Sequence, residues 1–211
     1  MAASDTLPRR AALAPDTRAG ELRYQRVAVY ALLAITVLRL VWLAGNPINL
    51  YPDEAQYWLW SRSLAFGYFS KPPLLPWIIA ATTALLGEDE FAIRVASPLL
   101  HLATGLVVYA IARRLYDARI ACWSALLYAT LPAVSLSSAI MSTDVPLMLC
   151  WAVALYAFIR AREAAGWRWW IVTGVAAGIG LLAKYAMEYW LLSALLLVLA
   201  FAYLEIGRAH V

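Results

Sequence analysis

The chain has 211 residues, of which 64% are hydrophobic and 14% are charged, and its mean hydropathy is +0.70. A soluble domain carries about 25% charged residues and roughly 45–50% apolar ones, so this composition excludes a soluble globular protein. With 2 cysteines, 10 glycines and 10 prolines, a disulfide framework, a collagen-like chain and a disordered chain are excluded as well. We therefore expect an all-α polytopic membrane protein.

Stretches with few charges predict about six transmembrane helices, because a helix needs about 20 mainly apolar residues to cross a bilayer. They cover residues 27–50, 95–112, 120–143, 145–159, 169–183 and 189–204, and the last three need an extra turn to span. Residues 1–26 are polar and predict a flexible cytoplasmic tail. Residues 27–204 then form the transmembrane domain.

The basic residues predict the orientation, since Lys and Arg concentrate in cytoplasmic loops. With the N-terminus in the cytoplasm, the cytoplasmic segments hold 12 of the 17 basic residues, the outer segments hold 4, and Arg39 lies within a span. The acidic residues divide as 7 outside and 6 inside. The net charge of +4 therefore follows membrane topology and predicts no nucleic-acid partner. We expect a multi-pass protein of the inner (plasma) membrane with its functional site on the outer face.

The first outer loop, residues 46–92, is far longer than a connection needs to be, and long ordered loops are usually functional. Asp53 is predicted to cap a helix, with Glu54 in its first turn. The aromatic run that starts at Tyr57 favours a helix lying in the headgroup zone. A second apolar helix is predicted over residues 74–86, either re-entrant or interfacial.

Three further charged residues belong to the same outer side. Lys71 precedes a proline pair in the first loop, Asp144 begins the fourth span, and Lys184 ends the fifth. Charged groups at membrane depth cost roughly 2.5–3.5 kcal/mol and usually face a cavity, so we expect these residues to line one cavity with Asp53 and Glu54.

Other polar residues of the spans carry weaker predictions. Arg39 either pairs with a carboxylate or packs structurally, Arg94 is interpreted as a boundary anchor, and His101 as a packed polar residue. No residues have metal-ligand spacing, so no metal site is predicted and a requirement for a divalent metal stays open. The glycines Gly174 and Gly178 form a GxxxG pattern, which predicts close helix packing within the chain or between two copies.

This set of groups favours transfer of a group from a lipid-linked phosphate donor. A carboxylate such as Asp53 would act as general base on an acceptor hydroxyl, and a lysine such as Lys71 would neutralise the leaving phosphate. The chain has neither GxxxxGK[ST] nor GxGxxG, so a nucleotide donor has no evident cradle. The alternative is a transporter or lipid-binding protein with an ionisable pathway. The sequence shows no internal repeat and its outer charges cluster at one face, which favours an enzyme.

Four segments carry a resemblance to a known family. LYPDEAQYW (50–58) and GYFSKPPL (67–74), with TDVP (143–146) and GLLAKY (180–185), resemble the family 39 glycosyltransferases. These membrane enzymes include the protein O-mannosyltransferases and the bacterial aminoarabinose transferase of lipid A. The resemblance runs from about residue 39 to 204, and the Asp-Glu and Lys-Pro-Pro combination is its most specific part.

The resemblance implies a GT-C fold, with juxtamembrane helices in the first outer loop and a polyprenyl-phosphate sugar donor used on the outer face. By this likeness Asp53 and Glu54 are catalytic, Lys71 contacts the donor phosphate, and Tyr57, Asp144 and Lys184 line the substrate cavity. It implies no cofactor besides the donor, and a lipid or protein acceptor. Because members of the family are longer, we interpret the chain as an N-terminal fragment, inactive alone, with residues 205–211 as a non-native tail.

Overall fold

The computed structural model describes residues 15–46, 48–163 and 166–209, and all regular structure in these ranges is α-helical. The helices are α1 (Pro15–Gly45), α2 (Pro52–Ser61), α3 (Leu74–Leu86), α4 (Glu90–Arg94), α5 (Ala96–Leu115), α6 (Ala118–Thr130), α7 (Pro132–Ser137), α8 (Asp144–Glu163), α9 (Arg168–Ala183) and α10 (Met187–Ala209). The all-α prediction is confirmed.

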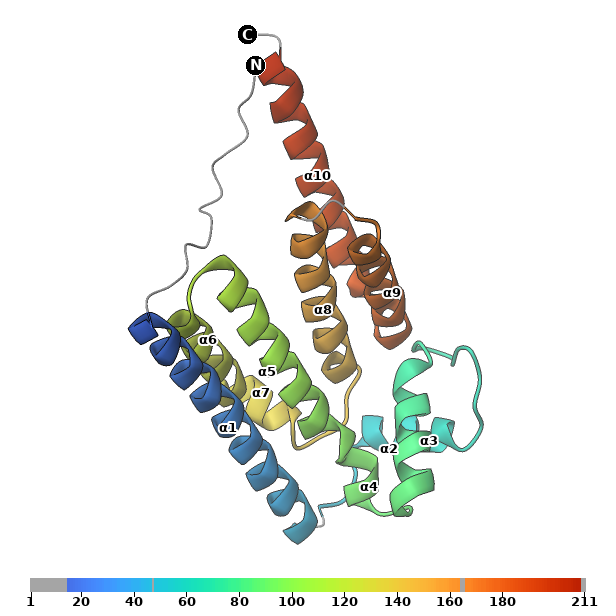
Figure 1. Cartoon of the computed structure of the whole chain (residues 1–211). Helices are drawn as coiled ribbons and strands as arrows, with labels where there is room; N and C mark the ends of the chain where they lie inside the picture. The colour runs from blue at the N-terminus through green and yellow to red at the C-terminus, as the bar shows by residue number, and fades with distance from the viewer. Residues whose placement is uncertain (1–14, 47, 164–165, 210–211) are drawn as a thin grey trace.

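The long helices form a bundle, and the short helices α2, α3 and α4 gather at one end of it, which we call the loop end (Figure 1). α1, α5 and α6 pack on one another, α5 joins them to α8, and α8 pairs with α9. α10 packs on α9 and extends beyond the bundle at the opposite end (Figure 1). The helices of the first loop therefore lie beside the adjoining ends of α8 and α9.

Three of the described helical segments are long and apolar enough to cross a membrane: Arg18–Gly45, Glu90–Leu115 and Asp144–Glu163. Shorter apolar helices cover Leu74–Leu86, Arg168–Ala183 and Met187–Tyr203. The number of six spans stays a prediction. Likewise, α3 forms with the predicted bounds, but whether it enters the membrane stays a prediction.

Two predicted boundaries differ from the structure. The first helix begins at Pro15, so residues 15–26 are helical and the prediction of a flexible tail is wrong for them. Residues 1–14, the rest of that predicted tail, lie outside the described residues. In the last helix, α10 continues to Ala209, and residues 210–211 of the predicted non-native tail are also outside the described part.

The segment 120–143 is not one continuous helix, because the helix breaks at Leu131, and whether the segment spans a membrane stays a prediction. Leu131 has φ −55° and ψ 134°, which is extended backbone, and α7 begins at Pro132. A residue that precedes proline is pushed out of the helical region, and proline supplies no N–H for the helical ladder. His101 of α5 packs beside this break, with its Nδ1 2.8 Å from the Tyr128 hydroxyl, which confirms it as a packed polar residue.

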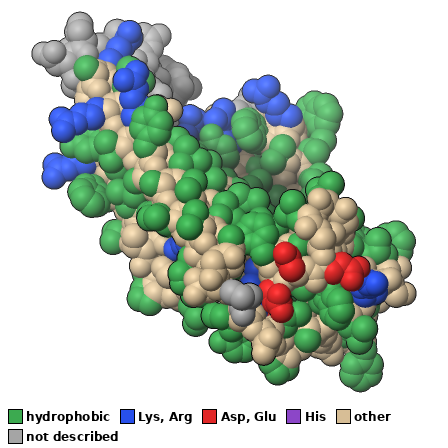
Figure 2. Space-filling model, turned by 90° about the horizontal axis from the view of Figure 1, so that it is seen from below, with side chains coloured by type: hydrophobic (Ala, Val, Ile, Leu, Met, Phe, Trp, Pro, Cys, Tyr) green, Lys and Arg blue, Asp and Glu red, His purple; other side chains and the backbone are tan. Residues whose placement is uncertain are grey.

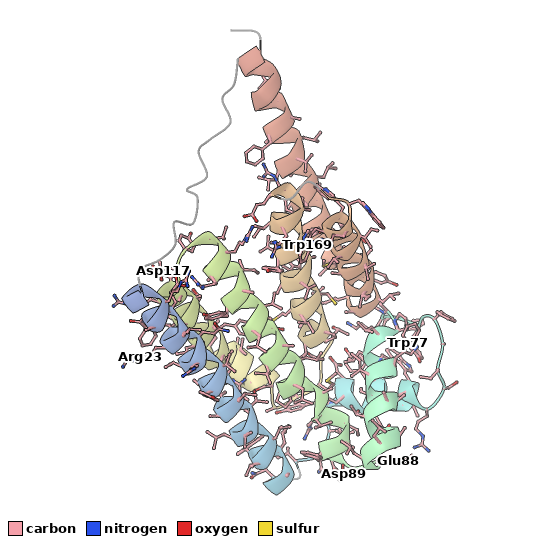
Figure 3. The ribbon with its side chains drawn as sticks, viewed as in Figure 1. Arg23, Trp77, Glu88, Asp89, Asp117 and Trp169 are labelled. Carbon is pink, nitrogen blue, oxygen red and sulfur yellow. The ribbon has the colours of Figure 1, made fainter. Side chains whose placement is uncertain are left out.

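The two ends of the bundle carry different charges. Glu88 and Asp89 lie at the loop end, whereas Arg23 and Asp117 lie at the opposite end (Figure 3). Seen from the loop end, acidic side chains gather on that face, while most visible Lys and Arg side chains lie toward the far rim (Figure 2). Glu88 and Asp89, which the sequence assigns to the outer side, thus lie together at the loop end. Which side of a membrane this end faces stays a prediction.

Candidate functional site

Asp53 and Glu54, both in the first turn of α2, have different surroundings: Asp53 is exposed and Glu54 is buried. The helix is capped by Tyr51 and not by Asp53, so the predicted cap is wrong by two residues. Pro52 occupies the first helical position, where its missing N–H costs nothing. Glu54 reaches back and accepts a hydrogen bond from the Tyr51 backbone N at 3.1 Å. Because successive helix residues point about 100° apart, Asp53 then faces another direction and is exposed.

Glu54 lies in a buried ion pair with Arg94. Nε and Nη2 of Arg94 donate to Oε1 and Oε2 of Glu54 at 2.9 and 2.6 Å. The side chains are 4% and 2% exposed for Arg94 and Glu54 respectively. The backbone N of Met141 also donates to Glu54 Oε1 at 2.8 Å. Arg94 in turn donates to the carbonyl oxygens of Ile48 and Asn49 at 2.8 and 3.2 Å. This pair therefore joins α2, α4, the segment before α2 and the segment before α8.

The role predicted for Arg94 as a boundary anchor is wrong. The sequence offered one indication of the buried ion pair. Arg94 stands between the apolar residues Ile93 and Val95, and a charged residue inside an apolar run usually has a buried partner. Glu54 has donors on both carboxylate oxygens and is turned away from the exposed face that holds Asp53. A direct catalytic role for Glu54 stays a prediction.

Tyr57 of α2 packs against α3 and the segment that precedes α8. Tyr57 is packed among Leu75, Ile79 and Met141 and is 3% exposed. Whether α2 lies in the headgroup zone stays a prediction. Burial raises the pKa of the Tyr57 phenol, the negative charges of Asp53 and Asp144 raise it further, and a hydrogen bond with Thr143 opposes both.

Asp144 forms an ion pair with Lys184. Lys184 Nζ lies 2.7 Å from Asp144 Oδ1, and the side chains remain 37% and 54% exposed respectively. Asp144 begins α8 and Lys184 follows the last residue of α9, and the two helices run side by side in opposite directions (Figure 1). The ends that meet beside the first loop therefore bring these two residues together.

Gly180 sets how closely α9 approaches its neighbours. A Cβ on Gly180 would stand 2.9 Å from the Met187 side chain and 3.2 Å from Cβ of Cys150. A Cβ on Gly174 or Gly178 would meet nothing within 4 Å. Close packing predicted from the GxxxG pattern is therefore wrong for those two glycines within the described chain, and Gly180 takes the role.

Lys71 lies in an ordered loop between α2 and α3. The carbonyl of Lys71 accepts a hydrogen bond from the Tyr68 N at 3.1 Å, and the Tyr68 ring stacks on Trp60 with a centroid distance of 5.0 Å. Trp77 of α3 also fastens this loop, because its Nε1 donates to the Ala65 carbonyl at 3.0 Å (Figure 3). The backbone around Lys71 is therefore held by aromatic residues on both flanking helices.

The loop also brings Lys71 to the neighbourhood of α9. Leu74, three residues later, packs against the buried cluster that contains Ala183, the residue before Lys184. The side chain of Lys71 is half-buried, and no hydrogen bond or ion pair between described residues joins it to Asp53, Asp144 or Lys184.

Of the six predicted site residues, Asp144 and Lys184 are joined by a direct contact. Asp53 and Tyr57 lie on α2 at the same end of the fold, and we call these four residues the loop-end cluster. Lys71 lies on the loop that follows α2, and Glu54 is buried in its pair with Arg94. Among the described residues, no group of three or more His, Cys, Asp or Glu is placed to hold a metal ion. The loop end thus offers exposed carboxylates and two lysines, which are groups that suit an acceptor hydroxyl and a phosphate.

The all-helical bundle, with the helices of its first loop at one end, agrees with the fold that the sequence resemblance implies. Residues 70–208 match the model of the family described as dolichyl-phosphate-mannose-protein mannosyltransferase. The chain belongs to this family, and the resemblance drawn from the four sequence segments is confirmed.

Curated relatives share the match. The chain is 38% identical over 165 residues to the lipid A galacturonosyltransferase RgtD of Rhizobium johnstonii, covering 78% of this chain and 35% of the relative. It is 33% identical over 182 residues to the undecaprenyl phosphate-alpha-4-amino-4-deoxy-L-arabinose arabinosyl transferase of Pseudomonas aeruginosa, covering 78% and 33%. The chain therefore spans about a third of the length of these relatives.

A solved structure shares the fold. The crystal structure of ArnT from Cupriavidus metallidurans in the apo state superposes with a TM-score of 0.64 at 22% sequence identity, covering 78% of this chain and 33% of ArnT. This agreement supports the arrangement of the helices.

Proposed function

We propose that this chain carries the catalytic loop of a membrane glycosyltransferase, which transfers a sugar from a polyprenyl-phosphate donor to an acceptor on the outer face of the inner membrane. The observation that carries the proposal is the difference between the two adjacent acids: Asp53 is exposed, whereas Glu54 is buried in its ion pair with Arg94. The exposed Asp144–Lys184 pair supports it. Two relatives, a lipid A galacturonosyltransferase and an enzyme named for an undecaprenyl-phosphate sugar, favour lipid A as the acceptor over a protein.

In this proposal each residue has a separate task. Asp53 removes the proton from the acceptor hydroxyl as its oxygen attacks the anomeric carbon, and the bond from that carbon to the phosphate oxygen breaks. The ammonium of Lys71 stabilises the charge that develops on the departing polyprenyl phosphate. Asp144 and Lys184 line the cavity, and Tyr57 forms its buried wall. Glu54 and Arg94 position α2, and thereby Asp53, without touching the substrate.

The test is sugar transfer by a hybrid in which this chain replaces the matching third of the Rhizobium lipid A galacturonosyltransferase. Mass spectrometry of lipid A measures transfer in membranes. We expect Asp53→Asn to lower the rate by about 10²–10⁴-fold, the usual contribution of a general base, with unchanged membrane insertion. Asp89→Asn is the matched control, because Asp89 caps α4 at the same end of the bundle. If the hybrid retains its rate with Asn at position 53, Asp53 is not the base.

A further inference from the structure

A groove separate from the candidate site opens between α1, the end of α6 and α7. Its volume is about 480 Å³, and its walls are mainly apolar, with Leu38 and Trp42 from α1 and Leu136 from α7. The helices that form it do not supply the residues of the cluster at the loop end, which come from α2, α8 and α9. Among the described residues that line the groove, Arg39 is the one that carries a charge.

Arg39 is held in place by the break between α6 and α7. Its Nη2 donates to the carbonyl oxygen of Ala129 at 2.5 Å and to Oγ of Ser135 at 3.2 Å. The carbonyl is available because Pro132 ends the helical hydrogen-bond ladder of α6. The guanidinium therefore has a fixed position at the wall of the groove and is not a side chain free to reach the membrane surface.

The charge of Arg39 is only partly compensated by these contacts. Both acceptors are neutral, and none of the ion pairs between described residues includes Arg39. The C-terminal end of α6 contributes a partial negative charge, equivalent to about half an elementary charge at most. A guanidinium has five N–H donors, and those of one nitrogen suffice for the two contacts. A cation at this depth therefore favours an anionic ligand, because an uncompensated charge in a membrane is costly.

We propose that this groove binds an anionic lipid, with Arg39 contacting the phosphate and the lipid chain lying on the apolar surface of α1. Trp42, one turn nearer the loop end, is exposed, and tryptophan is typical of the headgroup level. Leu38 is exposed on the same helix and offers a surface for the chain. An apolar helix seated in the groove would leave the cation of Arg39 without an anion, so the charge favours a lipid phosphate. A phospholipid and a polyprenyl phosphate share this chemistry. The site does not depend on the proposed transferase activity.

The experiment measures lipid retention by native mass spectrometry on the purified 211-residue chain in detergent. The probes are phosphatidylglycerol, undecaprenyl phosphate and, as a neutral lipid with the same tails, diacylglycerol. Lys71→Gln first weakens the phosphate contact proposed at the loop end. In that background we expect one anionic lipid to remain bound, and Arg39→Gln to lower its retention by about tenfold or more, because a charged hydrogen bond is lost.

A second variant guards against a folding defect in Arg39→Gln. Ala139→Leu keeps Arg39 but fills the groove, and we expect the same loss of anionic lipid with an unchanged elution volume and helical content. Competition between the two anionic probes identifies the source of the phosphate, and preference for either one agrees with the proposal. Unchanged retention in both groove variants, or equal retention of diacylglycerol, would overturn it.

Discussion

The Glu54 carboxylate and the Arg94 guanidinium, 40 residues apart in the chain, meet in a bidentate ion pair that is almost fully buried. The backbone of two other segments, before α2 and before α8, is hydrogen-bonded to this pair, while the neighbouring Asp53 points outward and is exposed. The Asp-Glu pair of the sequence thus divides into an exposed acid and a buried one.

Removing one partner of this pair is expected to destabilise the fold strongly. Arg94→Gln leaves the Glu54 carboxylate buried without its cation, which costs about 3–5 kcal/mol. The measurement is the temperature at which the detergent-solubilised chain loses its monodisperse elution peak. Arg62→Gln is the matched control, because Arg62 pairs with Glu88 at the surface, where such a pair contributes about 0–1 kcal/mol. Equal shifts for the two variants would contradict a structural role for Arg94.

The sequence alone does not distinguish the exposed Asp53 from the buried Glu54. Both were predicted to belong to one site, because adjacent acids in a first helical turn give no sign of which one faces the interior. That choice depends on Arg94, which the sequence alone did not pair with either acid. The bounds of the helix over 74–86 could be predicted, because its apolar run follows Pro73 and ends before Gly87. In the structure Gly87 has a φ of +102°. The break at Leu131 was predictable in principle from Pro132.

Gly180 and Gly178 differ in the space around them. Gly180→Ala is expected to lower stability by about 1–3 kcal/mol, the usual cost of overpacking, because the new Cβ would overlap Met187 and press on Cys150. Gly178→Ala has open space and is expected to be neutral or slightly stabilising, since alanine favours a helix more than glycine. Thermal unfolding of the two variants in the same detergent compares them directly. A larger loss for the Gly178 variant would restore the GxxxG interpretation.

The raised pKa of Tyr57 is expected to make the free energy of unfolding depend on pH in the alkaline range. Burial, with Asp53 and Asp144 nearby, raises the pKa of the folded phenol above its ordinary value, which is about 10. Below pH 10 both folded and unfolded Tyr57 are protonated, so its titration changes nothing. Above pH 10 the unfolded phenol loses its proton first, and the stability falls as pH rises toward the folded pKa.

The measurement for Tyr57 is the unfolding temperature of the chain and of Tyr57→Phe from pH 8 to 11.5. The difference between the two proteins should be constant up to about pH 10, and above it the Phe variant should lose less stability than the parent chain. A difference that stays constant over the whole range would show that the phenol keeps its ordinary pKa.

The two lysines of the site are expected to differ in how strongly they bind a phosphate. Lys184 is neutralised in part by Asp144 at 2.7 Å, whereas Lys71 makes no ion pair among the described residues. Lys71→Gln should therefore weaken undecaprenyl-phosphate binding more than Lys184→Gln does. Asp144→Asn should strengthen it, because Lys184 loses its competing carboxylate. Each effect should shrink at high salt, since these groups are partly exposed.

Titration of the chain with undecaprenyl phosphate tests this order, and Arg39→Gln in every variant removes the proposed groove site from the measurement. Lys71→Arg is the matched control and should retain most of the affinity, because the positive charge is kept while only the shape of the head changes. Weaker binding by Asp144→Asn would mean that Asp144 supports the phosphate indirectly and does not compete with it for Lys184. The sign of that one variant therefore decides whether the Asp144–Lys184 pair holds the cavity in shape or reserves a cation for the donor.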